Sequence, residues 1–304
     1  MSKGSTKYHE PVMLKESIDA LAIKPDGIYV DTTFGGGGHA QTILSKLGEE
    51  GKLLAFDQDP EALENSIDDE RLILINSNFR YIKNFLKLYK AQPVDGIFAD
   101  LGVSSFQFDN AHRGFSTRFN GPLDLRMNPK SELSAAQIIN RYSKEKLRTL
   151  FKQYGEIKNA THLANMVENF RKNQEITSTG QLAEISRKCA PRNKENKYLA
   201  QVFQALRIEV NEELEALKIM LENSVELLKP EGRLVVLAYH SLEDRLVKNF
   251  FKAGNFEGNI EKDFYGHPQT PLKVITRKPI TPSEEETRNN SRARSAKLRI
   301  AEKK

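Results

Sequence analysis

Nine residues near the N-terminus, Asp31-Thr-Thr-Phe-Gly-Gly-Gly-Gly-His39, form the strongest chemical signal in the sequence. Consecutive glycines let the backbone turn sharply and approach a ligand without an intervening Cβ. Ordering them costs conformational entropy, which argues against a merely flexible turn. The segment joins an expected strand to an expected helix, at the sheet edge where α/β proteins bind ligands. The sequence therefore predicts a ligand-binding loop.

Two cofactors compete for this loop. Gly35-x-Gly37-x-x-Ala40 satisfies the dinucleotide-binding pattern, and Asp57 follows at the spacing of a ribose-binding acid. One such match is weak, and the loop contains no Lys or Arg, while Asp31 would repel a pyrophosphate. The same carboxylate would attract the sulfonium cation of S-adenosylmethionine, whose ribose Asp57 can still bind. The charges favour S-adenosylmethionine.

A second candidate group, Asp100-Leu-Gly-Val-Ser-Ser-Phe106-Gln107, follows another expected strand. A cytosine or adenine amine is a poor nucleophile because its lone pair is delocalised into the ring. Its methylation needs an acceptor for an N–H hydrogen, an aromatic face and an in-line methyl group. Asp100 can be the acceptor and Phe106 the aromatic face, as in the acidic-Pro-Pro-aromatic motif of amino-group methyltransferases, although both prolines are absent. The alternative is that Asp100 caps a turn and Phe106 belongs to the core.

His240 begins the segment His240-Ser-Leu-Glu-Asp-Arg245, which follows a later expected strand at the same sheet edge. Histidine is a common acid–base group in proteins, so this residue can accept the proton of the methylated amine, orient Asp100 or bind a phosphate. The sequence leaves these roles open. A serine hydrolase is disfavoured because no Gly-x-Ser-x-Gly motif occurs. No residue spacing indicates a metal site, and no metal is expected.

Two segments are candidates for RNA contact. The first, residues 109–126, combines acids, arginines and aromatic side chains: Asp109, Arg113, Phe115, Phe119, Asp124 and Arg126. Such a composition suits base stacking and phosphate contact, with Arg113, Phe115 and Arg126 as candidates. Pairing of the arginines with the two acids is equally compatible. The second, residues 288–304, is basic, and its candidates are Arg292 and Arg294; a solvated tail is the alternative.

Hydrophobic patterning predicts the elements that must position these residues. Short apolar runs predict strands at 28–31, 52–57, 72–75, 96–100, 233–239, 272–276 and 296–300. Helices are expected at 40–47, 60–66 and 81–89 between the first four. This alternation predicts an α/β fold with a mainly parallel sheet. The motif-bearing segments then share the carboxyl edge of that sheet.

The middle of the chain has a different pattern. No strand is expected between about 108 and 209, and helices are predicted at 135–154, 160–172 and 179–189. Ser178 or Thr179 would cap the last of these, and a long helix is expected over 198–228. We therefore predict one α/β domain, residues 1–108 and 210–304, interrupted by a helical insertion, 109–209. The insertion's mixed charge is typical of solvated helices, and with the catalytic edge it can form a cleft for a flipped-out nucleotide.

Composition narrows the class of protein. The 304 residues are 38% hydrophobic and 29% charged, as in globular proteins. No run approaches the roughly 20 apolar residues that cross a bilayer, and the first residues lack a secretory signal, so a cytoplasmic protein without a membrane partner is expected. The single cysteine, Cys189, excludes an internal disulfide framework. The net charge of +5 is compatible with a polyanionic partner.

The sequence resembles the bacterial 16S rRNA (cytosine-N4)-methyltransferase family nearly end to end. The motifs that carry the resemblance include the 31–39 loop and the segment 100–105. The others are His9-Glu-Pro-Val-Met-Leu14, Arg113-Gly-Phe-Ser116, Gly121-Pro-Leu-Asp-Leu-Arg-Met127, His240-Ser-Leu-Glu-Asp-Arg245 and Ser291-Arg-Ala-Arg-Ser-Ala-Lys-Leu-Arg299. Each is modest alone, but together and in this order they are specific.

The resemblance implies a Rossmann-like, class I S-adenosylmethionine-dependent methyltransferase domain with an RNA-recognising helical insertion. It implies methylation of N4 of a cytidine in the decoding centre, the P-site region, of 16S rRNA in the small ribosomal subunit. It also implies cofactor contacts at Gly37, Gly38, His39, Asp57, Phe79, Asp100 and Gln107. Physically, an aromatic ring at Phe79 can cover adenine and Gln107 offers both a donor and an acceptor, whereas His39 can instead pack the loop.

Several functions and assembly states remain open at this point. The alternatives are a methyltransferase of another RNA or DNA amine, an NAD-dependent Rossmann oxidoreductase, and an RNA-binding protein on an inactive methyltransferase fold. The sequence decides neither between free rRNA and an assembled subunit as substrate nor between a monomer and a homodimer.

Overall fold

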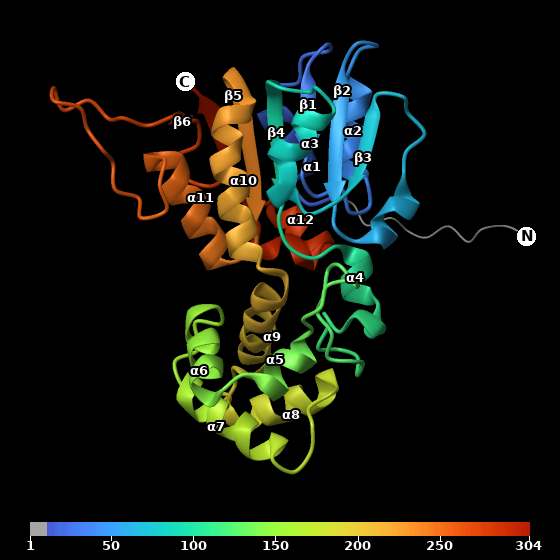
Figure 1. The fold of residues 1–304 in the computed structure, drawn as a ribbon, viewed down its shortest axis with the longest axis vertical. Coiled ribbons are helices and arrows are strands. Elements are labelled where there is room, and N and C mark those ends of the chain that lie inside the picture. Colours follow the sequence, from blue (N-terminus) through green and yellow to red (C-terminus); the bar gives the residue numbers. More distant parts are fainter. Residues whose placement is uncertain (1–10) are drawn as a thin grey trace, which may run out of the picture. The chain divides into compact units, whose positions relative to one another are not determined.

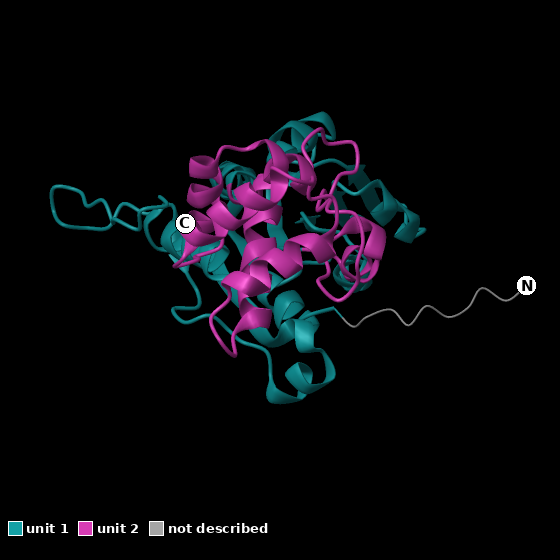
Figure 2. Ribbon diagram, turned by 90° about the horizontal axis from the view of Figure 1, so that it is seen from below, with its two compact units in different colours: residues 1–102, 215–304 teal, residues 103–214 magenta. Residues whose placement is uncertain are grey.

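The computed structural model describes residues 11–304, so His9 and Glu10 of the first family motif lie outside the described residues. The chain divides into two compact units, each described separately below. Unit 1 is Met1–Gly102 with Glu215–Lys304, and unit 2 is Val103–Leu214, coloured teal and magenta in Figure 2. The boundaries expected from the sequence, 108/109 and 209/210, fall a few residues inside unit 2.

Unit 1 is built on a seven-stranded sheet with the order β3-β2-β1-β4-β5-β7-β6. The strands are β1 Ile28–Asp31, β2 Lys52–Asp57, β3 Leu72–Asn76, β4 Val94–Asp100, β5 Leu228–Ala238, β6 Leu272–Val274 and β7 Lys297–Lys303. The first five strands pair in parallel, and β7 runs antiparallel to both β5 and β6. The expected mainly parallel α/β sheet is confirmed.

Both faces of this sheet are covered, as parallel sheets require. Successive strand residues alternate between the two faces: Val30 and Ile97 pack in one hydrophobic cluster, Tyr29 and Phe98 in the other. Helices α1 Leu14–Leu21 and α2 Gly38–Lys46 supply the second cluster. Helices α3 Ile82–Leu88, α10 Glu213–Leu227 and α11 Ser241–Ala253 supply the first and lie on the near side of the sheet in Figure 1.

The order of the strands creates a switch point between β1 and β4. From β1 the chain continues to β2 and β3 on one side, and from β4 the sheet continues to β5 on the other. Connections that diverge in this way leave a crevice outside the carboxyl ends of the two strands, where open α/β sheets bind ligands. Asp31 and Asp100 end these two strands.

Unit 2 consists of helices and loops in its described residues. The helices are α4 Ser105–Asp109, α5 Ala135–Arg141, α6 Lys144–Gln153, α7 Ala160–Arg171, α8 Thr179–Cys189 and α9 Glu195–Asn211, with the 3-10 turn η3 Ala111–Arg113. Their apolar faces share one core, which includes Leu163 and Val202. The expected cap of α8 is confirmed, because the Ser178 side chain accepts a hydrogen bond from the Gln181 amide. Within residues 11–304 no helix combines the length and apolarity needed to cross a membrane.

Several expected elements differ from the structure. The helix predicted over 135–154 is two helices, because Tyr142 adopts an extended conformation and Ser143 caps α6. The helix predicted over 198–228 is also interrupted, at Glu212, whose φ is 49°. The segment 60–66 forms a 3-10 helix, η1 Pro60–Asn65. The sequence did not predict α1, α11 or the short helix α12 Glu284–Asn289.

Candidate active site

Two of the expected acids come together at the switch point. Asp31 ends β1 and Asp100 ends β4, and these strands are parallel neighbours. Thr33 joins them: the Asp100 amide donates to Thr33 Oγ1 at 2.6 Å, and the Thr33 amide donates to Asp31 Oδ1 at 3.0 Å. Thr33 therefore fixes the Asp31 carboxyl group and the Asp100 backbone at the sheet edge where a ligand is expected.

Burial determines the chemistry of Asp31. Its exposed fraction is 0%, and its Oδ2 has no hydrogen-bond partner among residues 11–304. Desolvation raises the pKa of Asp31 to about 7, and hydrogen bonds from Thr33 and the charge of Asp57 have smaller, opposing effects. A buried carboxylate oxygen without a donor is stabilised by a cation. This position suits the sulfonium or ammonium group of a ligand.

Asp57 holds the glycine loop from the end of β2. The Gly35 amide donates to Asp57 Oδ2 at 2.8 Å, and the Asp59 amide donates to Oδ1 at 2.9 Å. Each carboxylate oxygen accepts more than one hydrogen bond. Asp57 can therefore fix the loop and still accept bonds from the hydroxyls of a ribose.

The two later glycines of the loop have steric reasons to be glycine. Gly37 precedes α2 with φ of 77°, and a Cβ added there would lie 3.0 Å from the Phe34 ring. A Cβ added at Gly38 would lie 2.3 Å from Cγ of Pro11. Both residues thus form the start of α2, whose first amides are available to a ligand because helix N-termini leave them unpaired within the helix.

Phe79 follows β3 beside the end of β2. The Asn76 side chain donates to the Asp57 carbonyl at 2.9 Å, and Asn78 donates to Gln58 Oε1 at 2.8 Å. These bonds hold the two strand ends together. Phe79 begins the 3-10 turn η2 Phe79–Tyr81 and is partly buried against the sheet. Its position next to Asp57 is compatible with covering the adenine of a nucleoside whose ribose Asp57 binds.

Asp100 has a partner that sequence reasoning missed. Tyr239, one residue beyond β5, donates its hydroxyl to Asp100 Oδ1 at 2.7 Å. Burial raises the pKa of Asp100 to about 7, the Tyr239 hydrogen bond lowers it, and the charges of Asp31 and Glu243 add to the rise. The Asp100 side chain remains 24% exposed, so a ligand can reach it. The only indication of this partner in the sequence was a tyrosine at the end of a predicted strand, next to the His240 motif.

His39 lies next to Asp100 but does not form an ion pair with it. Its Nδ1 is 3.8 Å from Asp100 Oδ2. Burial lowers the pKa of His39 to about 4, so the imidazole is neutral near pH 7. The ring packs against Phe98 with centroids 4.6 Å apart, and its Nε2 is 3.2 Å from the Val12 carbonyl. These contacts favour the loop-packing interpretation of its side chain.

His240 forms the cap of α11. Its Nδ1 accepts the Glu243 amide at 3.4 Å, while Glu243 Oε2 accepts the amides of Tyr239 and His240. The His240 side chain is only 8% exposed, and its Nε2 lies 3.1 Å from Glu243 Oε1. The structure thus connects His240 to Asp100 through the neighbouring Tyr239 and gives no direct bond between the two.

Phe106 and Gln107 belong to unit 2, in α4. Phe106 is 55% exposed, so the alternative that its ring belongs to the core is wrong. Gln107 is 4% exposed and completes a capping box with Ser104, in which each side chain accepts from the backbone amide of the other. The spacing Ser104-x-x-Gln107 is the sequence signature of that box.

The arginine-rich segment of unit 2 divides into buried and exposed side chains. Arg113 is 8% exposed and donates to the carbonyls of Arg126 and Met127. Arg126 pairs with Asp124 at 2.7 Å, as the structural alternative expected. Phe115 is 6% exposed and lies in the helical core. These positions favour a structural role for all three candidate RNA contacts in the segment.

Two other side chains of this segment face solvent. Phe119 is 51% exposed, and Arg118 beside it is exposed as well. The sequence placed Phe119 in the mixed segment but could not separate it from Phe115. An aromatic ring and a guanidinium side by side on the surface are the groups that stack on unpaired bases.

The basic C-terminal segment is part of the sheet, so the solvated-tail alternative is wrong. β7 pairs with β5 and β6, and Arg299 is buried against Asp244, its Nε donating at 2.7 Å. Arg292 is partly buried in the 3-10 turn η4 Ser291–Ser295, whereas Arg294 in the same turn is exposed. Only Arg294 of the two has an exposed side chain for an external partner.

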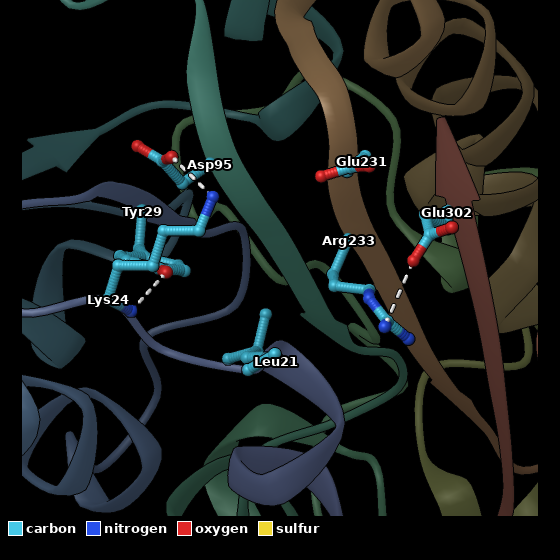
Figure 3. A pocket seen from close by; sticks show the side chains of 8 residues that line it. Leu21, Lys24, Tyr29, Asp95, Glu231, Arg233 and Glu302 are labelled. Atoms are coloured by element: carbon cyan, nitrogen blue, oxygen red, sulfur yellow. Dashed lines mark hydrogen bonds and ion pairs between the residues drawn. The ribbon is translucent and has the colours of Figure 1, made fainter. Parts of the chain in front are cut away.

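A hollow of about 170 Å³ lies at the amino ends of the strands, away from these residues. Figure 3 shows its charged side chains, four of which form ion pairs: Lys24 with Asp95, and Arg233 with Glu302; Glu231 is the fifth. Lys229 also binds Asp95, at 2.7 Å. The charges there balance, and the position is opposite the edge where such sheets bind ligands. We interpret this hollow as a structural ion-pair cluster.

Comparison with known proteins identifies the reaction class of the site at the carboxyl ends of the strands. Residues 6–304 match the model of the MraW methylase family. The chain belongs to this family. It is therefore a methyltransferase that uses S-adenosylmethionine, the donor for which the acids and glycines of the site are suited.

Relatives within the family match along the whole chain. The chain is 54% identical over 304 residues to "Ribosomal RNA small subunit methyltransferase H" of Bacteroides thetaiotaomicron, covering 100% of both chains. It is 56% identical over 297 residues to the protein of the same name from Flavobacterium johnsoniae, covering 98% of both. Among solved structures it resembles an rRNA methylase from Streptococcus thermophilus, with 13% identity, coverage of 95% of this chain and 94% of that one, and a TM-score of 0.42.

Proposed function

We propose that this methyltransferase transfers a methyl group from S-adenosylmethionine to N4 of a cytidine in the decoding centre of 16S rRNA, in the small ribosomal subunit. The observation that carries the proposal is the juxtaposition of Asp31 and Asp100 at the switch point. One buried acid suits the cationic donor, and the other is reachable and can accept an N–H hydrogen. The choice of rRNA follows the names of the whole-length relatives.

The cofactor residues divide by the part of S-adenosylmethionine that they suit. Asp31 faces the sulfonium or the amino group, and Gly37 and Gly38 allow the methionine moiety to approach the start of α2. Asp57 accepts from the ribose hydroxyls, and Phe79 covers the adenine. Among the remaining family positions, His39 shapes the loop and Gln107 stabilises the start of α4.

Catalysis rests on positioning of the amine. Asp100 accepts an N–H hydrogen of the cytosine amine and so restricts the amine to the orientation in which its lone pair meets the methyl group. Tyr239 holds Asp100 Oδ1, which leaves Oδ2 for the substrate. Phe106 is an exposed ring that can stack on the base. Correct alignment of the reacting atoms contributes most of the acceleration in such a transfer.

The product can be identified directly. Small ribosomal subunits from cells that lack this gene are incubated with the protein and methyl-labelled S-adenosylmethionine, and the RNA is digested to nucleosides. We expect the label in N4-methylcytidine. Label in a different nucleoside would contradict the proposed base, and absence of transfer by a protein that binds the cofactor would contradict the proposed substrate.

The role of Asp100 has its own test. Asp100→Ala removes the acceptor, so turnover should be abolished while circular dichroism shows a folded protein. A variant that keeps nearly the full rate would show that Asp100 is structural.

A further inference from the structure

A second hollow, of about 290 Å³, lies at the carboxyl edge of unit 1, beside the end of β5. Thr281 and two chain segments line it. One is the start of α11, with Tyr239, His240 and Ser241, and the other is the junction of η4 and β7, with Arg294, Ser295 and Lys297. The hollow is open to solvent and large enough for a phosphate group.

Two cationic side chains, Arg294 and Lys297, line this hollow. Arg294 is exposed and makes no hydrogen bond or ion pair within residues 11–304. Lys297 binds Asp244 at 3.0 Å, but Arg299 also binds this carboxylate, so two cations share one anion. Two further acids lie near Tyr239: Glu243 is buried and accepts backbone amides, and Glu286 accepts the Met13 amide. Among the described residues, Arg294 is therefore a cation without an acidic partner that lines the hollow.

Hydrogen-bond donors add to this charge. α11 is a helix of 13 residues, and its N-terminus at Ser241 carries the positive end of the helix dipole. The His240 side chain is more than nine-tenths buried and lines the hollow. Its Nε2 is buried and lies 3.1 Å from Glu243 Oε1, so this nitrogen is directed at the carboxylate. An anion in the hollow would meet Arg294, Lys297 and the N-terminus of α11 together.

Tyr239 connects the hollow to the proposed catalytic acid, since it lines the hollow and donates its hydroxyl to Asp100. We infer that the hollow is a subsite for a backbone phosphate of the RNA, adjacent to the nucleotide whose base amine is held by Asp100. This inference rests on the proposed function. Binding the phosphate here would fix the sugar–phosphate backbone while Asp100 receives the base, so that one nucleotide is held at two points.

Another anion with similar chemistry is the methionine carboxylate of the cofactor. The two sources are distinguished by measuring the binding of S-adenosylmethionine and the binding of RNA independently. An RNA phosphate predicts that loss of the Arg294 charge weakens binding to ribosomal subunits and leaves the cofactor dissociation constant unchanged. The cofactor carboxylate predicts the reverse.

The experiment compares Arg294→Gln and Arg294→Lys with the wild-type protein, using unmodified small ribosomal subunits and labelled S-adenosylmethionine. Arg277→Gln is the matched control, because Arg277 is an exposed arginine of the same unit that does not line the hollow. For Arg294→Gln we expect KM for subunits to rise about ten- to a hundredfold, the range for a hydrogen-bonded charge pair, with kcat largely retained. Arg294→Lys should recover part of the loss.

Salt dependence gives a second readout that a structural defect would not produce. Each lost contact with a single-stranded phosphate lowers the slope of log affinity against log salt by about 0.7. Arg294→Gln should show this reduction, and Arg277→Gln should match the wild type. An unchanged KM and slope for Arg294→Gln would overturn the subsite, and so would a parallel loss of cofactor binding. If the wild-type protein transfers no methyl group to subunits, it is the proposed function that fails.

Discussion

At the level of single residues, the site combines two acids whose protonation differs from that of ordinary surface carboxyls. Burial raises the pKa of both Asp31 and Asp100 to about 7. Before a ligand binds, each is therefore largely protonated below pH 7 and ionised above it. A cation binds the ionised form, so binding of a cationic donor below pH 7 requires loss of protons. Affinity for S-adenosylmethionine should consequently increase as the pH rises through 7.

The neutral product S-adenosylhomocysteine separates this effect from other titrations, because it differs from the donor in lacking the sulfonium charge. The preference for the donor over the product should be greater at about pH 8 than at about pH 6, one unit either side of the acids' pKa. Asp31→Asn should reduce the preference by about tenfold, a typical effect of losing a charged partner. Calorimetric titration of both ligands measures it, and an identical pH dependence for donor and product would contradict the assignment of Asp31.

Tyr239→Phe removes the hydroxyl that binds Asp100 and leaves the ring in place. Its hydrogen bond lowers the Asp100 pKa, so the loss should shift the acidic limb of the pH–rate profile to higher pH. We also expect kcat to fall by about tenfold, because a hydrogen bond to a charged group contributes roughly 1.5 kcal/mol or more. Binding of S-adenosylmethionine is the control and should be unaffected. A uniform loss of rate at every pH would indicate a packing role instead.

At the level of elements, the strand ends and the loop after β1 position the cofactor residues. The loop is fixed by the Asp57 carboxylate at one end and by the start of α2 at the other. Its glycines are needed at particular points and not throughout. Gly37 has φ of 77°, whereas Gly36 has no positive φ and is exposed.

Gly37→Ala should therefore be more harmful than Gly36→Ala. The first change places a Cβ in a left-handed backbone conformation, 3.0 Å from Phe34, and should lower the free energy of unfolding by about 1–2 kcal/mol. It should also weaken the binding of S-adenosylmethionine, because the start of α2 must move. Chemical denaturation and cofactor titration of both variants make the comparison. Equal effects would show that the backbone conformation at Gly37 is not the determinant.

At the level of the whole molecule, the chain forms two units with separate hydrophobic cores. The buried residues of the unit 2 core all lie between Phe115 and Val210, and the two clusters of unit 1 contain none of them. The proposed cofactor residues other than Gln107 belong to unit 1. A ligand bound by one unit stabilises that unit by mass action.

Hydrogen exchange can test whether the units respond separately. S-adenosylmethionine at about 100 times its dissociation constant should stabilise unit 1 by about 2.7 kcal/mol, which corresponds to roughly hundredfold slower exchange. We expect this slowing for core amides of β1 and β4, such as Val30 and Ile97, and much less for Leu163 and Val202 of unit 2. The same slowing in both sets would mean that the two units unfold together.

The sequence by itself determined the parts of the protein that depend on local pattern. Apolar runs alternating with helices predicted the parallel sheet, and each strand's end then identified Asp31, Asp57 and Asp100 as residues of one edge. The N-cap of α8 could also be predicted from local pattern, because the Ser178 side chain accepts a hydrogen bond from an amide only three residues away. The interruption of the long helix at Glu212 was not, because nothing in its residue type requires a left-handed conformation.

Only the tertiary structure decided which side chains of similar type face a ligand. Phe115 and Phe119 are four positions apart in one segment, yet one is buried and the other exposed. Arg113 and Arg294 were equal candidates for RNA contact. Arg113 is buried and donates to backbone carbonyls, whereas Arg294 lines a hollow. Tyr239 reaches Asp100 across 139 residues of sequence. The burial and the hydrogen-bond partners of these side chains depend on long-range packing, which local composition does not predict.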